Sequence, residues 1–158
     1  MADTFTQIYI QIVFAVQNRK ALINDSWEEQ LYKYITGIIT KKGQKLLIIN
    51  GMPDHIHIFI GMKPTCCLSD LVREIKKSSN TFIKESNFTK SKFNWQEGFG
   101  AFSYSHSHID NVYKYILNQK VRHKKVSFKQ EYLEILEKFS VEFKEDYVFE
   151  FFEDEINK

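Results

Sequence analysis

The sequence predicts an α+β fold, a ferredoxin-like or RRM-like sandwich whose antiparallel sheet carries helices on one face, with additional helices at the C-terminus. Strand and helix patterns alternate along the chain in the order β-α-β-β-α-β, which is the order of that sandwich. The turn between the second and third strands is short, so these strands form an antiparallel hairpin. In this layout two helices cover one face of the sheet, and the other face is left free.

The first half of the chain supplies a long strand, a helix and a hairpin. Apolar side chains recur at every second residue from Ile8 to Val16, which predicts a strand over residues 5–17. The capping-box pattern Ser-Trp-Glu-Glu at residues 26–29 predicts the start of a helix that ends near Gly43. Residues 45–50 are expected to form the second strand, and residues 51–54 turn the chain into the third.

The second half supplies another long helix, two short strands and two more helices. Ser69 is the expected N-cap of the second helix, because apolar residues recur at helical spacing after it. Residues 94–96 and 100–105 are predicted to be short strands around a glycine-containing turn. Further helices are expected over about 107–122 and about 127–140.

Length and composition predict one domain over residues 1–158, with a core at about 5–125 and a helical, acidic extension at 126–158. A hydrophobic content of 43% excludes a disordered chain. The sequence has no apolar run long enough to span a bilayer and no signal-peptide pattern, so no membrane partner is expected. Adjacent cysteines, Cys66 and Cys67, offer no disulfide framework, which favours a reducing, cytoplasmic location.

The net charge of +2 conceals an uneven distribution. Seven acidic residues against two lysines give residues 141–158 a net charge of −5, so the rest of the chain carries +7. A basic body suits a partner with a phosphate backbone, although the same charge also keeps a protein soluble.

Residues 52–60, Met-Pro-Asp-His-Ile-His-Ile-Phe-Ile, combine a strand pattern with two histidines. Because side chains alternate along a strand, His55 and His57 share one face, while Ile56 and Ile58 share the helix-covered face. A rise of about 3.3 Å per residue separates the two histidine Cα atoms by about 6–7 Å, so both imidazoles can bind one cation. The histidines therefore lie on the free face, and open sheets of this class commonly bind single-stranded nucleic acid. Such a pair also arises by chance.

A second candidate pair lies on the helix expected at about 107–122. Tyr115 and Gln119 are four residues apart, so their side chains lie one above the other on a helix. A tyrosine hydroxyl attacks a phosphate when a cation neutralises the phosphoryl oxygens, and Gln119 offers a neutral oxygen ligand for such a cation. The alternative is an ordinary amphipathic helix with a tyrosine at its boundary. The histidine pair favours the first interpretation.

The sequence resembles the single-tyrosine HUH transposases of small bacterial insertion sequences, including their relatives that act on repetitive extragenic palindromes. The matching segments are residues 52–60, residues 95–105 (Trp-Gln-Glu-Gly-Phe-Gly-Ala-Phe-Ser-Tyr-Ser) and residues 115–124 (Tyr-Ile-Leu-Asn-Gln-Lys-Val-Arg-His-Lys). Residues 12–20 are similar as well, so the resemblance covers most of residues 5–125. Residues 126–158 are least like the family, and their role is left unassigned.

The resemblance implies that His55, His57 and Gln119 bind a divalent metal ion, Mg²⁺ or Mn²⁺, and that Tyr115 is the nucleophile. Such enzymes cut single-stranded DNA beside hairpins, hold the 5′ end as a phosphotyrosine and release a free 3′ hydroxyl. The same tyrosine then rejoins the strand. The resemblance also implies a homodimer in which the tyrosine helix completes the partner's site in trans.

Basic residues on a loop and two helices are the expected DNA contacts: Arg19, Lys20, Arg73, Lys76, Lys77 and Arg122. On the second helix the alternative is an ordinary solvated face. His123 is expected to contact a phosphate or to lie at the surface.

Other tyrosines and histidines compete for the same roles. Tyr104 and Tyr113 have no glutamine four residues later. His106 and His108 repeat the spacing of the strand pair, but we expect them not to bind metal, because the family's strand pair is already present.

Two alternative functions remain open at this point. One is a non-catalytic binding module for single-stranded nucleic acid that keeps the fold, and it expects binding to survive the loss of Tyr115. The other is a hydrolytic metallonuclease that uses His55 and His57 with activated water, and it leaves no covalent protein–DNA adduct. The presence of all four candidate residues favours the transposase.

Overall fold

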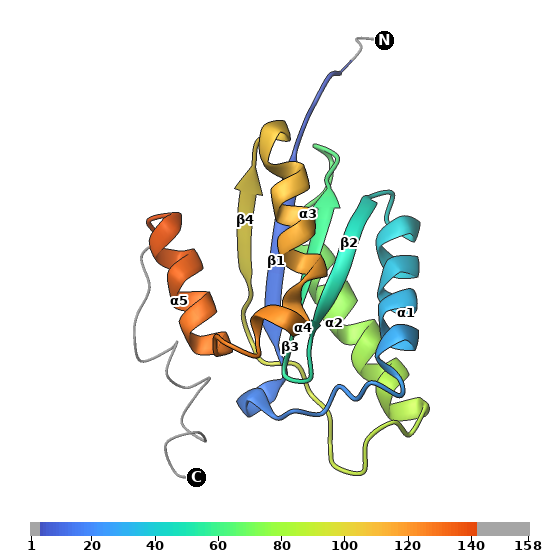
Figure 1. The fold of residues 1–158 in the computed structure, drawn as a ribbon. Coiled ribbons are helices and arrows are strands. Elements are labelled where there is room, and N and C mark those ends of the chain that lie inside the picture. The colour runs from blue at the N-terminus through green and yellow to red at the C-terminus, as the bar shows by residue number, and fades with distance from the viewer. Residues whose placement is uncertain (1–3, 142–158) are drawn as a thin grey trace.

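A computed structural model describes residues 4–141, and it contains a four-stranded antiparallel sheet (Figure 1). The strands are β1 (Tyr9–Ala15), β2 (Lys45–Met52), β3 (His55–Gly61) and β4 (Gly100–Tyr104), and their order across the sheet is β2-β3-β1-β4. Helices α1 (Glu28–Lys41) and α2 (Leu68–Glu85) connect β1 to β2 and β3 to β4. The predicted β-α-β-β-α-β order and the α+β fold are confirmed.

The main hydrophobic core lies between the sheet and helices α1 and α2. From the sheet it takes every second residue of β1 and β3, including Ile12, Ile56 and Ile58, which are fully buried. From the helices it takes apolar residues at helical spacing, such as Ile35 and Ile75. The period-two and period-3.6 patterns of the sequence therefore meet in this layer.

The second face of the sheet is covered, and the expectation of a free face was wrong. Helices α3 (Ile109–Leu117) and α4 (Gln119–Arg122) lie in front of it in Figure 1, and α5 (Phe128–Lys138), beside β4 in that view, packs on the same face. Phe59 of β3 packs with Val112 and Ile116 of α3, and Phe102 of β4 packs with Phe128 of α5. These apolar side chains on the second face need a cover, because leaving them in water forfeits the hydrophobic free energy of burial.

Several element boundaries differ from the expected ones. The first strand is shorter, and the capping box at residues 26–29 does not form: Trp27 is the N-cap of α1 and makes no side-chain cap bond. The backbone N–H of Ser26 instead donates to Asn24 Oδ1 at 3.0 Å. Helix α2 begins one residue before Ser69, with Cys67 as its N-cap. The predicted stop near Gly43 is confirmed, because Gly43 follows α1 with a φ of +79°.

Two further predicted elements take a different form. The segment 94–96 contributes one isolated bridge, between Trp95 and Val16, and no full strand. The helix expected at about 107–122 is divided: a 3₁₀ turn at His106–His108 precedes α3, and Asn118 separates α3 from α4.

The hairpin between β2 and β3 is confirmed, and it brings the histidine strand into the centre of the sheet. Pairs such as Asn50 with His57 and Met52 with His55 set its register. Gly51 is required here, because a Cβ on it would lie 2.2 Å from the carbonyl oxygen of His55.

Among residues 4–141, no helix is both long enough and apolar enough to cross a membrane. The seven acidic residues that give residues 141–158 their negative net charge lie beyond residue 141, outside the described residues.

Candidate active site and metal centre

His55 and His57 point from β3 toward the layer of C-terminal helices, and neither is exposed to solvent. Their ring centroids lie 5.2 Å apart, so the prediction that both share one face of the strand is confirmed. Because β3 lies between β1 and β2, its backbone is paired on both edges. This pairing fixes the positions from which the two imidazoles extend.

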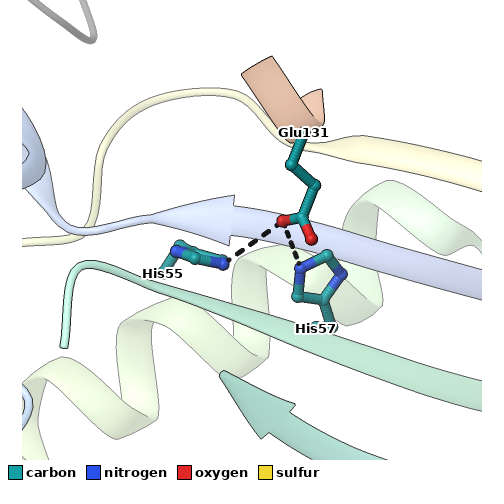
Figure 2. A group of neighbouring side chains, drawn as sticks. All are labelled: His55, His57 and Glu131. Atoms are coloured by element: carbon teal, nitrogen blue, oxygen red, sulfur yellow. Dashed lines mark hydrogen bonds and ion pairs between the residues drawn. The ribbon is translucent and has the colours of Figure 1, made fainter. Parts of the chain in front are cut away.

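Glu131 of α5 joins the two histidines (Figure 2). Its Oε1 lies 3.0 Å from His57 Nε2 and 3.5 Å from His55 Nε2, and its side chain is fully buried. One ligand atom from each of the three residues lies within 4.8 Å of the others. Imidazole nitrogens and a carboxylate oxygen are ligands that divalent transition metals accept, so the donor set fits such an ion.

Glu131 is positioned by α5, whose apolar residues pack on His55 and the sheet. Ser127 caps the helix by accepting a hydrogen bond from the Gln130 backbone N–H at 3.2 Å. The Phe128 ring then stacks on the His55 imidazole, with centroids 3.9 Å apart and planes 10° from parallel. Glu131 follows three residues later and therefore faces the same way.

Sequence reasoning missed Glu131. The only available signal was its position three residues after Phe128. A single glutamate on a helix rich in charged residues gives no sign of burial by itself.

Gln119 lies at the site, as expected. It is fully buried at the start of α4, and its Oε1 is 3.3 Å from His55 Nε2. Its Nε2 donates to Glu131 Oε2 at 3.0 Å. The amide oxygen is thus directed at one of the two imidazoles, where a shared cation would lie.

Tyr115 of α3 lies beside the same cluster. Its hydroxyl donates a hydrogen bond to Glu131 Oε2, and its ring centroid is 5.9 Å from that of His57. The Arg122 guanidinium lies over the tyrosine ring, 5.1 Å from the centroid. Burial and the Glu131 carboxylate raise the pKa of Tyr115 above its ordinary value. The hydroxyl therefore stays protonated in this cluster.

Asp54 and Arg19 hold His55 in position. His55 Nδ1 donates to Asp54 Oδ1 at 2.7 Å, which leaves Nε2 to face a cation. Arg19 Nε lies 3.5 Å from Asp54 Oδ2, and the arginine side chain is only 7% exposed. Burial alone would raise the pKa of Asp54, but the hydrogen bond from His55 and the charge of Arg19 lower it.

Gln11 and Tyr104 hold His57. Gln11 Nε2 lies 2.9 Å from His57 Nδ1, and the Tyr104 hydroxyl donates to Gln11 Oε1 at 2.7 Å. Binding of a cation at His57 Nε2 requires the proton on Nδ1. The Gln11 amide would then have to present its oxygen to this ring, since an amide can be placed in either orientation.

Glu131 is the electrostatic centre of the cluster. Burial on its own would raise the pKa of this carboxyl, but hydrogen bonds from His123, His55 and His57 outweigh that effect and lower it. His123 Nε2 lies 3.1 Å from Glu131 Oε1, so this histidine belongs to the site more directly than the sequence indicated. A carboxylate held ionised among imidazoles can bind a cation without first losing a proton.

The predicted DNA-contact residues separate into three groups. Arg19 is buried against Asp54, and Arg122 lies at Tyr115. Lys76 donates to the backbone carbonyls of Gln96 and Gly98, at 2.7 Å and 2.6 Å. The exposed group comprises Lys20, Arg73 and Lys77.

The other candidate tyrosines and histidines lie outside the cluster of His55, His57 and Glu131. Tyr113 is 41% exposed, whereas Tyr104 is bonded to Gln11. His106 and His108 are exposed on the turn before α3. Among the described residues, the cluster that could hold a metal ion contains neither of them.

A protein-family model described as "Transposase IS200 like" matches residues 4–119 of this chain. The chain belongs to the IS200-like transposase family. The match begins before β1, includes the histidine strand and the tyrosine helix, and ends at Gln119. Glu131 lies beyond it.

Two solved structures support the fold. A proposed transposase from Deinococcus radiodurans R1 shares 20% identity with a TM-score of 0.62, over 75% of this chain and 95% of that one. A REP-associated tyrosine transposase bound to a REP hairpin shares 17% identity with a TM-score of 0.58, over 80% of this chain and 76% of that one. A search of curated protein sequences finds no significant match.

Proposed function

We propose that this IS200-like transposase is a metal-dependent tyrosine transesterase that cuts and rejoins single-stranded DNA near hairpins. One observation carries the proposal: the Glu131 carboxylate contacts both the Tyr115 hydroxyl and the paired imidazoles of His55 and His57. A nucleophile and a candidate cation site thus adjoin in one buried cluster, as transfer of a phosphodiester requires.

The proposed reaction needs no external energy source. The Tyr115 oxygen forms a bond to the scissile phosphorus as the bond to the leaving 3′ oxygen breaks, giving a 5′-phosphotyrosine and a free 3′ hydroxyl. Glu131 Oε2 already accepts the hydrogen bond of the tyrosine hydroxyl and lies where the departing proton goes. Attack by a 3′ hydroxyl on the phosphotyrosine reverses the exchange and restores the tyrosine.

His55, His57, Gln119 and Glu131 are the residues that would hold Mg²⁺ or Mn²⁺. The ion would polarise the phosphoryl oxygens and offset the charge that develops there. Asp54 and Gln11 orient the two imidazoles toward it.

Single-stranded DNA with a hairpin is the proposed partner, in the cytoplasm. The REP hairpin bound to the second structural neighbour supports this choice, and so does the basic charge of the chain before residue 141. A homodimer remains part of the proposal, but one chain already brings its own Tyr115 to its own His57. We therefore expect catalysis in cis, and completion of the site in trans is not needed for this geometry.

A denaturing gel distinguishes this function from the two alternatives. Wild-type protein with a labelled single-stranded hairpin and Mn²⁺ is expected to give a labelled protein band, and Tyr115→Phe and His57→Ala are expected to give none. Tyr113→Phe, altered at an exposed tyrosine on the same helix, serves as the matched control. Cleavage by Tyr115→Phe without an adduct would indicate a water-using nuclease. Binding without cleavage by the wild type would indicate a binding module.

A further inference from the structure

A groove opens from the Tyr115 side chain between α3 and α5. It has a volume of about 330 Å³, and Gln11 of β1 and Tyr104 of β4 form part of its lining. Figure 1 shows α3 and α5 on either side of β4, and residues of both helices line the groove. This volume is within the range of cavities that hold small ligands.

The helix positions along the groove carry polar residues. On α3 they include Asn111 and Tyr115, four residues apart, and on α5 they include Glu134 and Lys138, also four apart. Helices that cover a sheet pack against it through apolar stripes and turn their polar residues away from it. The polar residues at these positions border a space beside Tyr115 that a ligand with hydrogen-bonding groups can occupy.

The charges along the groove are balanced. Arg122 and Lys138 are matched by Glu131 and Glu134, and Arg122 Nη2 lies 3.2 Å from Glu134 Oε2. A channel for a phosphate backbone would carry an excess of basic residues. A cavity with balanced charges, lined by both polar and apolar side chains, suits an uncharged, planar group with hydrogen-bonding edges.

A nucleobase is such a group. Asn111 offers both a donor and an acceptor, which is what the edge of a base requires. Aromatic rings such as that of Tyr104 offer surfaces on which an unstacked base can rest. The groove therefore has the chemistry of a single-base pocket next to the reacting atoms.

We propose that the groove between α3 and α5 binds the base of the nucleotide on the 3′ side of the scissile phosphate, with Asn111 as the residue that reads its edge. The assignment rests on the function proposed above. The attacking and leaving oxygens lie roughly in line on opposite sides of the phosphorus. The leaving 3′ oxygen therefore departs away from Tyr115, whereas the nucleotide on the 3′ side becomes joined to the Tyr115 oxygen through its 5′ phosphate. Its base then stays within reach of the groove, because Tyr115 is part of the groove's lining.

The test asks whether the effect of removing the Asn111 side chain depends on the presence of one base. Affinity for a fluorescent single-stranded hairpin is measured in EDTA, so that no cleavage intervenes, after the cleavage position has been mapped with Mn²⁺. For the wild type, an abasic site 3′ of the scissile phosphate is expected to weaken binding about tenfold. Asn111→Ala is expected to weaken binding of the intact strand about fivefold and to add no further loss on the abasic strand.

Three controls make the result specific to the groove. Tyr113→Phe, on the exposed side of α3, is expected to bind both strands as the wild type does. An abasic site on the 5′ side is expected to weaken Asn111→Ala and the wild type equally. Circular dichroism and the melting temperature show whether Asn111→Ala keeps its fold, and Asn111→Gln serves as a second variant if it does not.

If Asn111→Ala weakens binding of the intact strand and of the 3′ abasic strand by the same factor, the assignment is wrong. It is also wrong if the effect of Asn111→Ala disappears on the 5′ abasic strand instead. Adduct formation by the wild type without coupling contradicts only the groove assignment. Absence of any adduct contradicts the proposed function itself.

Discussion

Glu131 connects the two halves of the site. Its two carboxylate oxygens contact different groups: Oε1 lies 3.0 Å from His57 Nε2, and Oε2 accepts from Tyr115. A carboxylate in this position can bind the cation and hold the nucleophile at once. Its complete burial makes the contact strong, because little water screens the charges.

Glu131→Gln tests whether the carboxylate is a metal ligand. The amide keeps the size of the side chain but loses its charge, so Mn²⁺ affinity is expected to fall by at least about tenfold. Isothermal titration calorimetry measures the affinity. Glu137→Gln, at an exposed position of the same helix, is the matched control and should bind Mn²⁺ normally. Unchanged affinity in Glu131→Gln would remove this residue from the metal site.

Asp54 acts on the same ion through His55. Asp54→Asn replaces the carboxylate that accepts the Nδ1–H bond at 2.7 Å, so the imidazole is a weaker ligand and is less well oriented. Loss of such a partner typically lowers metal affinity about 10–100-fold. The same titration measures it, with Asp70→Asn on the exposed side of α2 as control. Wild-type affinity in Asp54→Asn would mean that the sheet alone orients His55.

At the scale of the elements, α5 covers the part of the sheet face that carries His55 and His57. Its Phe128 is buried against His55 and beside Val13 and Phe102 of the sheet, so the helix is attached by apolar packing as well as by Glu131. The local hydrophobic pattern predicted both the helix and its approximate bounds. It could not predict where the helix docks, because docking depends on contacts with β1 and β4, far away in the sequence.

Phe128→Ala is expected to loosen α5 selectively. Truncation of a buried phenylalanine costs about 3–5 kcal/mol, which here falls on the packing of one helix. Hydrogen exchange should accelerate at residues 128–138, while α1 and α2 exchange as in the wild type. Uniform acceleration along the whole chain would instead show that α5 and the central core unfold as one unit.

At the scale of the whole molecule, the sequence predicted what repeats locally and missed what depends on distant contacts. Period two placed His55 and His57 on one face. A spacing of four predicted Tyr115 and Gln119 on one helix, but Asn118 divides α3 from α4 between them, and the two side chains meet at Glu131 Oε2 instead. Glu131 reaches His57 across 74 residues, and no local pattern encodes that approach.

Local sequence also could not predict which basic residues are exposed. Arg19 lies in a basic loop, which is typical of a surface DNA contact. In the structure, residues 18 and 19 have left-handed backbone in a turn, and the Arg19 side chain is buried beside Asp54. A basic loop and a buried ion pair have the same local sequence, and only the fold distinguishes them.

Assembly of both halves of the site within one chain gives a prediction about oligomers. A mixture of Tyr115→Phe and His57→Ala proteins is expected to form no adduct, because each chain lacks one half of its own site. The denaturing gel measures this, with either variant alone as the background. Restored adduct in the mixture would establish completion of the site in trans by a second chain.

The polarity of the covalent adduct shows whether Tyr115 takes the 5′ end of the cut strand. Two batches of the same single-stranded hairpin, one labelled at the 5′ end and one at the 3′ end, are incubated with wild-type protein and Mn²⁺. Only the 3′ label is expected to migrate with the protein, and mass spectrometry is expected to find the nucleotide adduct on Tyr115. A protein-linked 5′ label, an adduct on another residue, or cleavage with neither label attached would contradict the proposed function.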